Sequence, residues 1–350
     1  MKFDLSEDQS LLQSSTRDFF AKEFALEKTR RVMEHEARGF EAPAWRQIAE
    51  MGYPGLLVPE AAGGQALGPI ELAIVCEEAG RVCLPGPLFD VQLAAATLAT
   101  AGNQDALLRA VCAGEKIVTI AWRNSPYAGE AKQTTHFAHG RVKGRKYFVP
   151  FAAAADALLV TTNEGLALVE GPFETTALPT VDLAQRFGEI ELDHPATLVG
   201  PLGILGRTDQ LAAVGASATL FGIMAKSLEI TLGYLQTRET FKRPIGAFQA
   251  LQHRMADMLL RTESSRSAVY RAAWCLAVGD PQTALACATA KAYAGDAARL
   301  VCAETVQMHG GIGFTWELDV HFFFKRAKTY EMHYGSTEAQ LERVLAAVGY

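Results

Sequence analysis

Three segments in the last third of the chain carry the residues best suited to chemistry. They read Arg238-Glu-Thr-Phe-Lys-Arg-Pro-Ile-Gly-Ala-Phe-Gln249, Gln307-Met-His-Gly-Gly-Ile-Gly-Phe314 and Tyr330-Glu-Met-His-Tyr-Gly-Ser-Thr-Glu338. An arginine presents a fork of N–H donors that suits phosphate oxygens. Glycine lets the backbone come close to a ligand. Residues of these types therefore suit an anionic ligand.

Each of these residues also has a structural explanation when it is considered alone. Arg238 could be a solvated cation near the C-terminal end of a helix, where the helix dipole favours it. The pair Gly310–Gly311 could simply end a helix, and Phe241 and Met308 could belong to a core. His309 is expected in a loop or a core rather than as a ligand. The joint occurrence of the three segments is what favours a binding site.

The order and spacing of the three segments resemble the C-terminal flavin-binding segments of the acyl-CoA dehydrogenase family. An earlier segment, Trp45-x-x-Ile-Ala-Glu-Met-Gly-Tyr-x-Gly55, is similar to the family as well, and so are Pro59-Glu60 and Gly63-Gly64. The resemblance covers nearly the whole chain. It implies an acyl-CoA thioester as substrate and FAD as cofactor, shared across a subunit interface.

The resemblance also implies which residues contact FAD, and most of them would serve the cofactor of a neighbouring subunit. Arg238 would reach the pyrophosphate, which the backbone at Gly310 and Gly311 would approach. Phe148 could pack on the flavin ring. The complete set of implied contacts is Arg238, Phe241, Gln249, Gln307, Gly310, Gly311, Ser336 and Phe148.

Tyr334 stands where the commonest pattern of the family carries its catalytic glutamate. That base takes a proton from the carbon beside the thioester carbonyl, while a hydride leaves the next carbon for the flavin. A carboxylate in a dry site can have its pKa raised toward neutrality for this task. A phenol with a pKa near 10 would cost about 4 kcal/mol to ionise at pH 7, which is roughly a thousandfold in rate.

A displaced base is the alternative to Tyr334. Some family members place the glutamate near the start of the first long C-terminal helix, but here that position is Ala212. Asp209 lies one turn earlier and is expected to cap this helix. His333 has a suitable pKa but lies one residue away from the required position. Glu331 has a similar problem.

The middle of the chain departs from the family pattern. Where the family shows Thr-Glu-Pro and Gly-Ser-Asp, this chain reads Ala121-Trp-Arg-Asn-Ser-Pro126. Where the family shows Trp-Ile-Thr, which contacts the flavin ring, this chain reads Lys146-Tyr-Phe-Val-Pro150. Pro150 offers neither a hydroxyl nor an N–H. The pattern resembles the shorter subunit of heteromeric acyl-CoA dehydrogenases of bacterial steroid side-chain degradation, in which a complete partner supplies the base.

Three functions stay open at this point. The chain could complete the FAD site of a second dehydrogenase subunit, or it could be a self-sufficient homo-oligomer with Asp209, His333 or Tyr334 as its base. It could also be a non-redox protein that binds acyl-CoA. The resemblance implies an electron-transferring flavoprotein as the electron acceptor. No motif reports the volume of an acyl pocket, so the acyl group is not assigned.

The expected fold is α+β and acyl-CoA dehydrogenase-like. It has an N-terminal helical domain at 1–113, a central β-domain (barrel or sandwich) at 114–200 and a C-terminal four-helix bundle at 201–350. In the N-terminal domain we expect a capping box at Ser6 and Gln9 and a helix from Pro69 toward Arg81. In the β-domain we expect a strand at 117–122 and a hairpin that joins 157–162 to 166–169. The bundle should contain a helix from 206, a helix from 248, a helix that begins with Asp280 as N-cap and Pro281 and ends at Gly310, and a helix after Ser336.

Composition argues against several other classes of protein. A net charge of −6 disfavours a nucleic-acid surface. The six cysteines form no CxxC pair and no metal-ligand spacing, which indicates reduced structural thiols. The first residues show no apolar leader, and no run approaches the roughly 18 uncharged apolar residues that a membrane span needs. A cytoplasmic protein without a membrane span is expected.

Overall fold

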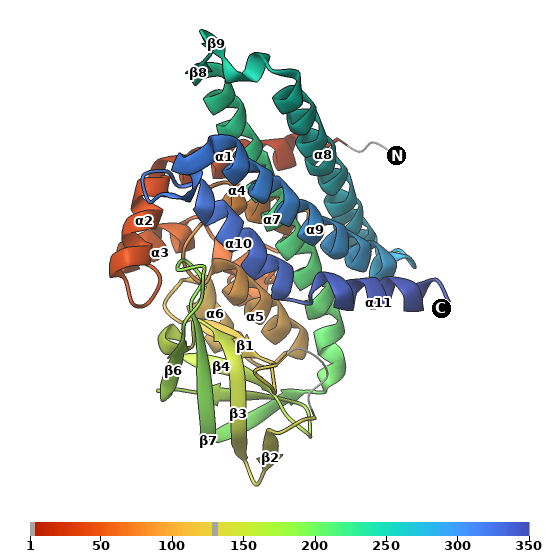
Figure 1. The fold of residues 1–350 in the computed structure, drawn as a ribbon. Coiled ribbons are helices and arrows are strands. Elements are labelled where there is room, and N and C mark those ends of the chain that lie inside the picture. The colour runs from red at the N-terminus through yellow and green to blue at the C-terminus, as the bar shows by residue number, and fades with distance from the viewer. Residues whose placement is uncertain (1–3, 128–131, 350) are drawn as a thin grey trace. The chain divides into compact units, whose positions relative to one another are not determined.

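The chain folds into two compact units in the computed structural model, which describes residues 4–127 and 132–349 (Figure 1). One unit, the helical unit, comprises the chain up to Thr29, Pro69–Leu84 and the chain from Gln210 onward. The other, the sheet unit, comprises Arg30–Gly68 and Pro85–Asp209.

The helical unit confirms the predicted capping box at its first helix. Ser6 Oγ accepts the Gln9 N–H at 3.2 Å, and Gln9 Oε1 accepts the Ser6 N–H at 3.0 Å. The helices are α1 (Glu7–Glu23), the start of α2 (Leu26–His35), α4 (Pro69–Arg81), most of α7 (Leu205–Thr237), α8 (Gln249–Val278), α9 (Thr283–His309), α10 (Val320–Met332) and α11 (Thr337–Ala347). Gly222 lets helix α7 approach helix α4 closely, since a Cβ at this position would lie only 1.9 Å from the carbonyl oxygen of Glu77.

The C-terminal bundle is built around α9, which packs against α8, α10 and α11. The prediction was wrong about the start of this helix, which begins at Thr283 rather than just after Asp280. The reason is a turn: the Asp280 carboxylate accepts the Gln282 N–H at 2.7 Å, and its carbonyl accepts the Thr283 N–H at 3.0 Å. The prediction also missed α10 as a separate helix.

Helix α7 is the longest helix among the described residues, and its middle is buried on all sides. Within residues 4–127 and 132–349, the segment Leu202–Thr237 is the one helix long and apolar enough to cross a membrane, with a mean hydropathy of 1.5 in its best window. However, 83% of that window is buried inside the protein, which is the pattern of a core helix.

The sheet unit holds a mixed sheet of seven strands in the order β1-β4-β5-β7-β3-β2, with β6 beside β7 (Figure 1). β1 pairs with β4 in parallel, and the other pairs are antiparallel. The strand and the hairpin predicted for this region are confirmed. The strands are β1 (Val118–Ala121), β2 (His136–Ala138), β3 (Arg141–Pro150), β4 (Ala157–Thr161), β5 (Leu166–Glu170), β6 (Thr175–Leu178) and β7 (Phe187–Gly200).

One buried cluster forms the core of this sheet. It joins Ala121 of β1 to Val142 of β3, although these two strands stand far apart in the strand order. The sheet therefore curls around the cluster. A bulge between Lys146 and Val149 interrupts the pairing of β3 with β7 and changes the direction of the side chains there. The helices of this unit are α3 (Ala42–Glu50), α5 (Leu88–Ala101) and α6 (Asp105–Cys112), together with the end of α2 and the first turn of α7.

Candidate functional site

The first predicted segment forms a small hairpin between α7 and α8, made of β8 (Glu239–Thr240) and β9 (Arg243–Pro244) (Figure 1). Phe241 and Lys242 at its tip have φ of 52° and 62°. Two positive φ values in succession are typical of a tight hairpin turn. The turn leaves the Phe241 side chain 86% exposed. Phe241 is therefore not a core residue.

Arg238 begins this hairpin and is exposed. Its backbone is fixed on both sides, since its N–H bonds to the Tyr234 carbonyl at 2.8 Å and its carbonyl accepts the Ile245 N–H at 2.8 Å. Gln249, the first residue of α8, is exposed as well. The hairpin thus holds a guanidinium, an aromatic ring and an amide toward solvent.

The second predicted segment lies at the end of α9 and in the turn η6 (Gly310–Phe314). Gly310 has φ 62° and ψ −143°, a conformation that is essentially restricted to glycine. A Cβ added at Gly310 or Gly311 would meet no atom within 4 Å. Gln307, one turn earlier, is exposed. The backbone here is open to a ligand or to another chain.

A contact between two rings joins the helix ends that carry the two segments. The Tyr234 ring of α7 stacks on the His309 ring of α9 with centroids 4.4 Å apart. His309 Nδ1 lies 2.7 Å from the Thr305 carbonyl, so Nδ1 carries the proton, and burial lowers the pKa of the ring. His309 is thus a core histidine, as expected. We call the exposed set the bundle-end surface: Arg238, Phe241, Gln249, Gln307, Gly310 and Gly311.

Phe148, the predicted partner of the flavin ring, lies in the sheet unit and is half-buried. The Arg123 guanidinium lies 4.9 Å from the centre of the ring, and the Phe187 ring packs edge to face at 6.2 Å. Phe148 also has a positive φ of 49°, next to the bulge in β3. The Phe148 ring therefore contacts two side chains of its own chain.

Lys146, two residues earlier, is fully buried, and the sequence did not mark it as special. Its ammonium donates to Asn124 Oδ1 at 2.5 Å, to Thr161 Oγ1 at 2.7 Å and to Gln133 Oε1 at 3.4 Å. Burial lowers the pKa of Lys146 to about 7. Side chains alternate along a strand, so Lys146 lies on the same face of β3 as the buried Val142, four residues earlier. This spacing is the signal from which its burial could have been predicted.

Tyr334 lies in the four-residue connector between α10 and α11, and its side chain is only 8% exposed. Its ring packs against the rings of His333 at 4.0 Å and Tyr330 at 6.4 Å between centroids. Ser336 Oγ accepts the Ala339 N–H at 3.4 Å and so caps α11. The connector residues are therefore engaged with their own chain.

The candidates for a displaced base are also constrained. Asp209 was expected to cap α7, but the helix begins at Leu205 and Asp209 is its fifth residue, so the expectation was wrong. Ala212 is buried. The buried carboxylate of Glu331 pairs with Lys328 at 2.5 Å. Within the described part of the chain, no group of His, Cys, Asp and Glu side chains could hold a metal ion.

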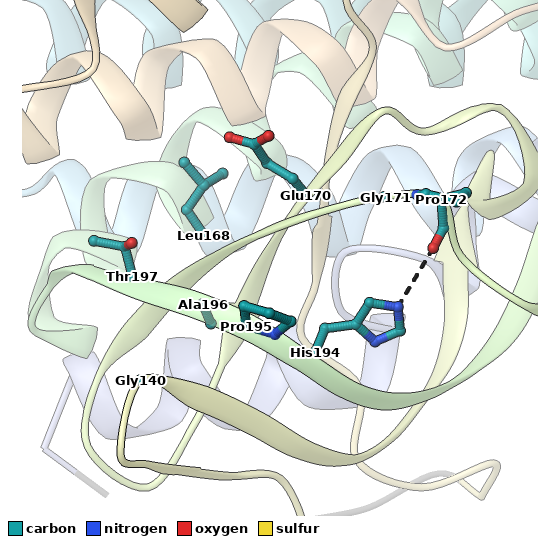
Figure 2. Close-up of a pocket in the computed structure, with 9 residues that line it drawn as sticks. All are labelled: Gly140, Leu168, Glu170, Gly171, Pro172, His194, Pro195, Ala196 and Thr197. Atoms are coloured by element: carbon teal, nitrogen blue, oxygen red, sulfur yellow. Dashed lines mark hydrogen bonds between the residues drawn. The ribbon is translucent and has the colours of Figure 1, made fainter.

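Two hollows of the sheet unit do not involve the predicted residues. One has a volume of about 530 Å³ and lies between β5 and β7, where His194 Nε2 is 3.3 Å from the Pro172 carbonyl (Figure 2). Its only titratable lining residues are Glu170 and His194, and most of its lining is exposed. A second, of about 410 Å³, has Arg38 and Arg186 among its lining residues. Neither contains a constellation suited to acid–base chemistry.

Comparisons with known proteins agree with the geometry over the whole length of the chain. The family model described as "Acyl-CoA dehydrogenase, N-terminal domain" matches residues 6–115, and "Acyl-CoA dehydrogenase, C-terminal domain" matches residues 210–349. The chain is 30% identical to acyl-CoA dehydrogenase IpdE2 of Mycolicibacterium smegmatis, over 98% of this chain and 100% of that protein.

Two solved structures share the fold closely. A chain of the ChsE4–ChsE5 complex from Mycobacterium tuberculosis superposes with a TM-score of 0.90 at 28% identity and covers 99% of both chains. A chain of the Tcur3481–Tcur3483 steroid ACAD superposes with a TM-score of 0.90 at 29% identity and covers 98% of both chains. The fold predicted from the sequence is thus confirmed.

Proposed function

Because the chain belongs to the acyl-CoA dehydrogenase family, we propose that it is a subunit that completes the FAD site of a second, catalytically complete subunit. Enzymes of this family are FAD-dependent oxidoreductases that act on CH–CH bonds. The assembled enzyme would remove the α proton and the β hydride of an acyl-CoA thioester, the base coming from the partner.

The observation that carries the proposal is the contrast in exposure between two sets of residues. The bundle-end surface fits the pyrophosphate half of FAD, because Arg238 is exposed and the backbone at Gly310 and Gly311 is open. The guanidinium would hold phosphate oxygens, and the glycines would admit them closely. Phe241 and Gln249 extend the same exposed surface.

The flavin-ring half does not fit the residues present. The Arg123 guanidinium lies over the half-buried Phe148 ring, and the nearby Lys146 is buried with three oxygen partners. Pro150 offers no donor for a flavin nitrogen. Tyr334 brings a buried phenol rather than a carboxylate. This chain would therefore hold part of the cofactor for its partner, without a ring pocket of its own.

The relatives support the same assignment. One of the similar structures is the ChsE4–ChsE5 complex, and another, Tcur3481–Tcur3483, is described as a steroid ACAD. We therefore favour a hetero-oligomer over a homo-oligomer and an acyl-CoA whose acyl group is borne on a steroid. By family membership, the electron acceptor would be an electron-transferring flavoprotein.

The six cysteines of the chain are all buried and free, which fits the prediction of structural thiols. Proteins of reducing compartments keep such thiols reduced. On this ground we propose that the protein works in the cytoplasm.

The test is to purify the chain alone and again after co-expression with a complete family member encoded beside it. We expect a nearly colourless protein alone and a complex that carries flavin, whose visible absorbance bleaches on adding acyl-CoA. A yellow homo-oligomer with one FAD per chain that is reduced by acyl-CoA would contradict the proposal and favour a displaced base. Tight acyl-CoA binding without flavin in either preparation would instead indicate a non-redox binding protein.

A further inference from the structure

The connector between α10 and α11, His333–Ser336, has an unusual backbone. Tyr334 has φ +61° and Gly335 has φ +93°, so two successive residues are left-handed. For a bulky residue such as tyrosine this conformation is disfavoured, and it persists only where the surroundings hold it in place. The connector carries the side chain at the family's base position, so the groups that hold it decide where that side chain lies.

A single buried ammonium binds both the last turn of α10 and the connector that follows it. Lys291 of α9 is fully buried, and its Nζ donates to the Gly335 carbonyl at 2.8 Å and to the Glu331 carbonyl at 3.1 Å. The Glu331 carbonyl belongs to the last turn of α10, where helical carbonyls lack partners and the helix dipole favours a cation. Lys291 thus satisfies the end of one helix and fixes the turn that follows it.

Two further contacts hold the connector against α9 and α11. Gln340 Nε2 donates to the Tyr334 carbonyl at 3.2 Å. Gly295 lies one turn after Lys291 on α9, and a Cβ there would lie 2.9 Å from Thr337 Oγ1 and 3.2 Å from Glu331 Cγ. On one face of α9, Lys291 therefore supplies a hydrogen-bond donor, and Gly295, which has no side chain, lets Thr337 and Glu331 approach closely.

The charge of Lys291 is costly to bury, which argues for a specific role. Burial lowers the pKa of Lys291 to about 7, the nearby Glu331 carboxylate opposes this shift, and Arg343 adds to it. The Glu331 carboxylate itself pairs with Lys328, so the close partners of Lys291 are backbone carbonyls. In sequence, Lys291 is the only charged residue between Thr283 and Gly295. An isolated lysine in an alanine-rich helix is the signal that could have revealed it.

We propose that Lys291 is a positioning residue: its ammonium holds the Glu331 and Gly335 carbonyls, and so fixes the connector in the one arrangement that the shared flavin site accepts. This inference rests on the proposed function, because it takes the connector backbone and Ser336, a predicted FAD contact, to border the FAD shared with a partner, although Tyr334 supplies no base. Lys291 itself acts through the backbone rather than by touching the reacting atoms.

The test uses Lys291→Met, which keeps the length of the side chain and removes its donors. Lys146→Met is the matched control, because it deletes an equally buried ammonium with oxygen partners in the sheet unit. Gly295→Ala is a second way to displace the connector, without removing a charge. Amide hydrogen exchange is measured on each chain alone, and flavin retention and the visible flavin spectrum are measured on each complex with the partner.

We expect Lys291→Met and Gly295→Ala to raise exchange at residues 333–337 roughly tenfold or more, since hydrogen bonds from charged donors are lost or displaced. Both complexes should then retain flavin roughly tenfold less well and show a shifted visible spectrum, while Lys146→Met leaves exchange in the connector unchanged. Unchanged exchange in Lys291→Met would overturn the positioning role. Raised exchange with unaltered flavin retention and spectrum would overturn its link to the site. Failure of the proposed function is seen separately, as a wild-type complex without flavin.

Discussion

The bundle-end surface and the surroundings of Phe148 treat similar residue types in opposite ways. At the bundle end, Phe241 stays 86% exposed although the Phe248 ring lies nearby at 6.3 Å. In the sheet unit, the half-buried Phe148 ring packs against Arg123 and Phe187. An aromatic ring left exposed is open to another chain or ligand, whereas a ring packed by its own chain contributes to its own fold.

The cations of the two regions differ in the same way. Arg238 extends from a fixed backbone into solvent, while Lys146 is buried and bonded to three oxygens. Tyr334 belongs with the second group, because it is buried among its neighbours. Under the proposed function, burial and pairing would mark residues that no longer serve a flavin ring, and exposure would mark residues that contact FAD held with a partner. The predictions below test this division.

The largest effect is expected from Lys146→Met, which removes a buried charge from the covered region. Burial lowers the pKa of Lys146 from 10.5 to about 7, so between these pH values the unfolded chain holds a proton that the folded protein has released. The free energy of unfolding therefore rises with pH across this window, by up to a few kcal/mol at about 1.4 kcal/mol per unit. The variant should lose this share of the rise, measured by urea unfolding at about pH 7 and pH 9.5.

The same window includes Lys291, whose pKa is lowered to a similar value, so part of the rise stays in the variant. Lys143→Met is the control, because Lys143 lies on the same strand with its side chain 79% exposed. This control should keep the full pH dependence. If Lys146→Met keeps it as well, Lys146 is not the buried charge that the comparison requires.

The next effect concerns Arg238→Ala in the complex with the partner. Loss of a charge-assisted hydrogen bond to phosphate should weaken flavin retention roughly ten- to hundredfold. The melting temperature of the isolated chain should barely change, because Arg238 is exposed. The measurement is flavin release on dilution of the complex. Arg243→Ala, in the same hairpin with its guanidinium 4.1 Å from the centre of the Phe248 ring, should retain flavin; equal losses in both variants would mean a general effect of charge.

A smaller effect on flavin retention is expected at Gly310 and Gly311. Alanine substitutions at these two positions distinguish strain in the backbone from the loss of close approach by a ligand. Gly311 has no positive φ and open space around its Cα, so Gly311→Ala should change the stability of the isolated chain by less than about 0.5 kcal/mol. In the complex, the added methyl should weaken flavin retention by up to about tenfold, because close approach is lost. Gly310→Ala, strained by its positive φ, should instead destabilise the chain alone by about 1–3 kcal/mol.

Flavin retention by each complex and thermal unfolding of each chain check this pair. If Gly311→Ala weakens the isolated chain as much as Gly310→Ala does, both glycines serve the fold. The open backbone at Gly311 would then give no support for the binding of FAD at the bundle-end surface.

Local patterns predicted much of the fold, and the failures have a physical cause. The capping box at Ser6 and the hairpin around Asn163–Gly165 depend on contacts between near neighbours, which a sequence displays directly. α10 was missed because its buried face contains a charge: Arg326 is 2% exposed and donates to the Leu84 carbonyl at 3.0 Å. A charged residue on the core side hides the apolar stripe that marks a helix.

For the candidate site, the sequence predicted residue types but not their exposure. Phenylalanine is usually buried, so nothing local to the sequence separates exposed Phe241 from half-buried Phe148. Lysines are almost never fully buried, so Lys146 and Lys291 were not suspected. In each case the deciding partner is distant in sequence, as Glu331 is from Lys291. Tertiary contacts, which the periodicity of the sequence does not encode, decide whether such a residue is exposed or buried.

The smallest effects on flavin retention and on kcat are expected from Phe148→Ala and Tyr334→Phe. Small effects would place both residues among those that serve only the fold of their own chain. If Phe148 packs only on its own chain, its loss should cost stability, through the contacts with Arg123 and Phe187, and leave flavin retention by the complex within about twofold. Tyr334→Phe removes the phenol oxygen of a residue that supplies no base, so kcat should also stay within about twofold. Steady-state turnover with acyl-CoA and flavin release measure both. A drop in kcat of a hundredfold or more in Tyr334→Phe, with flavin still bound, would make the phenol part of the chemistry and move Tyr334 to the functional side of the division.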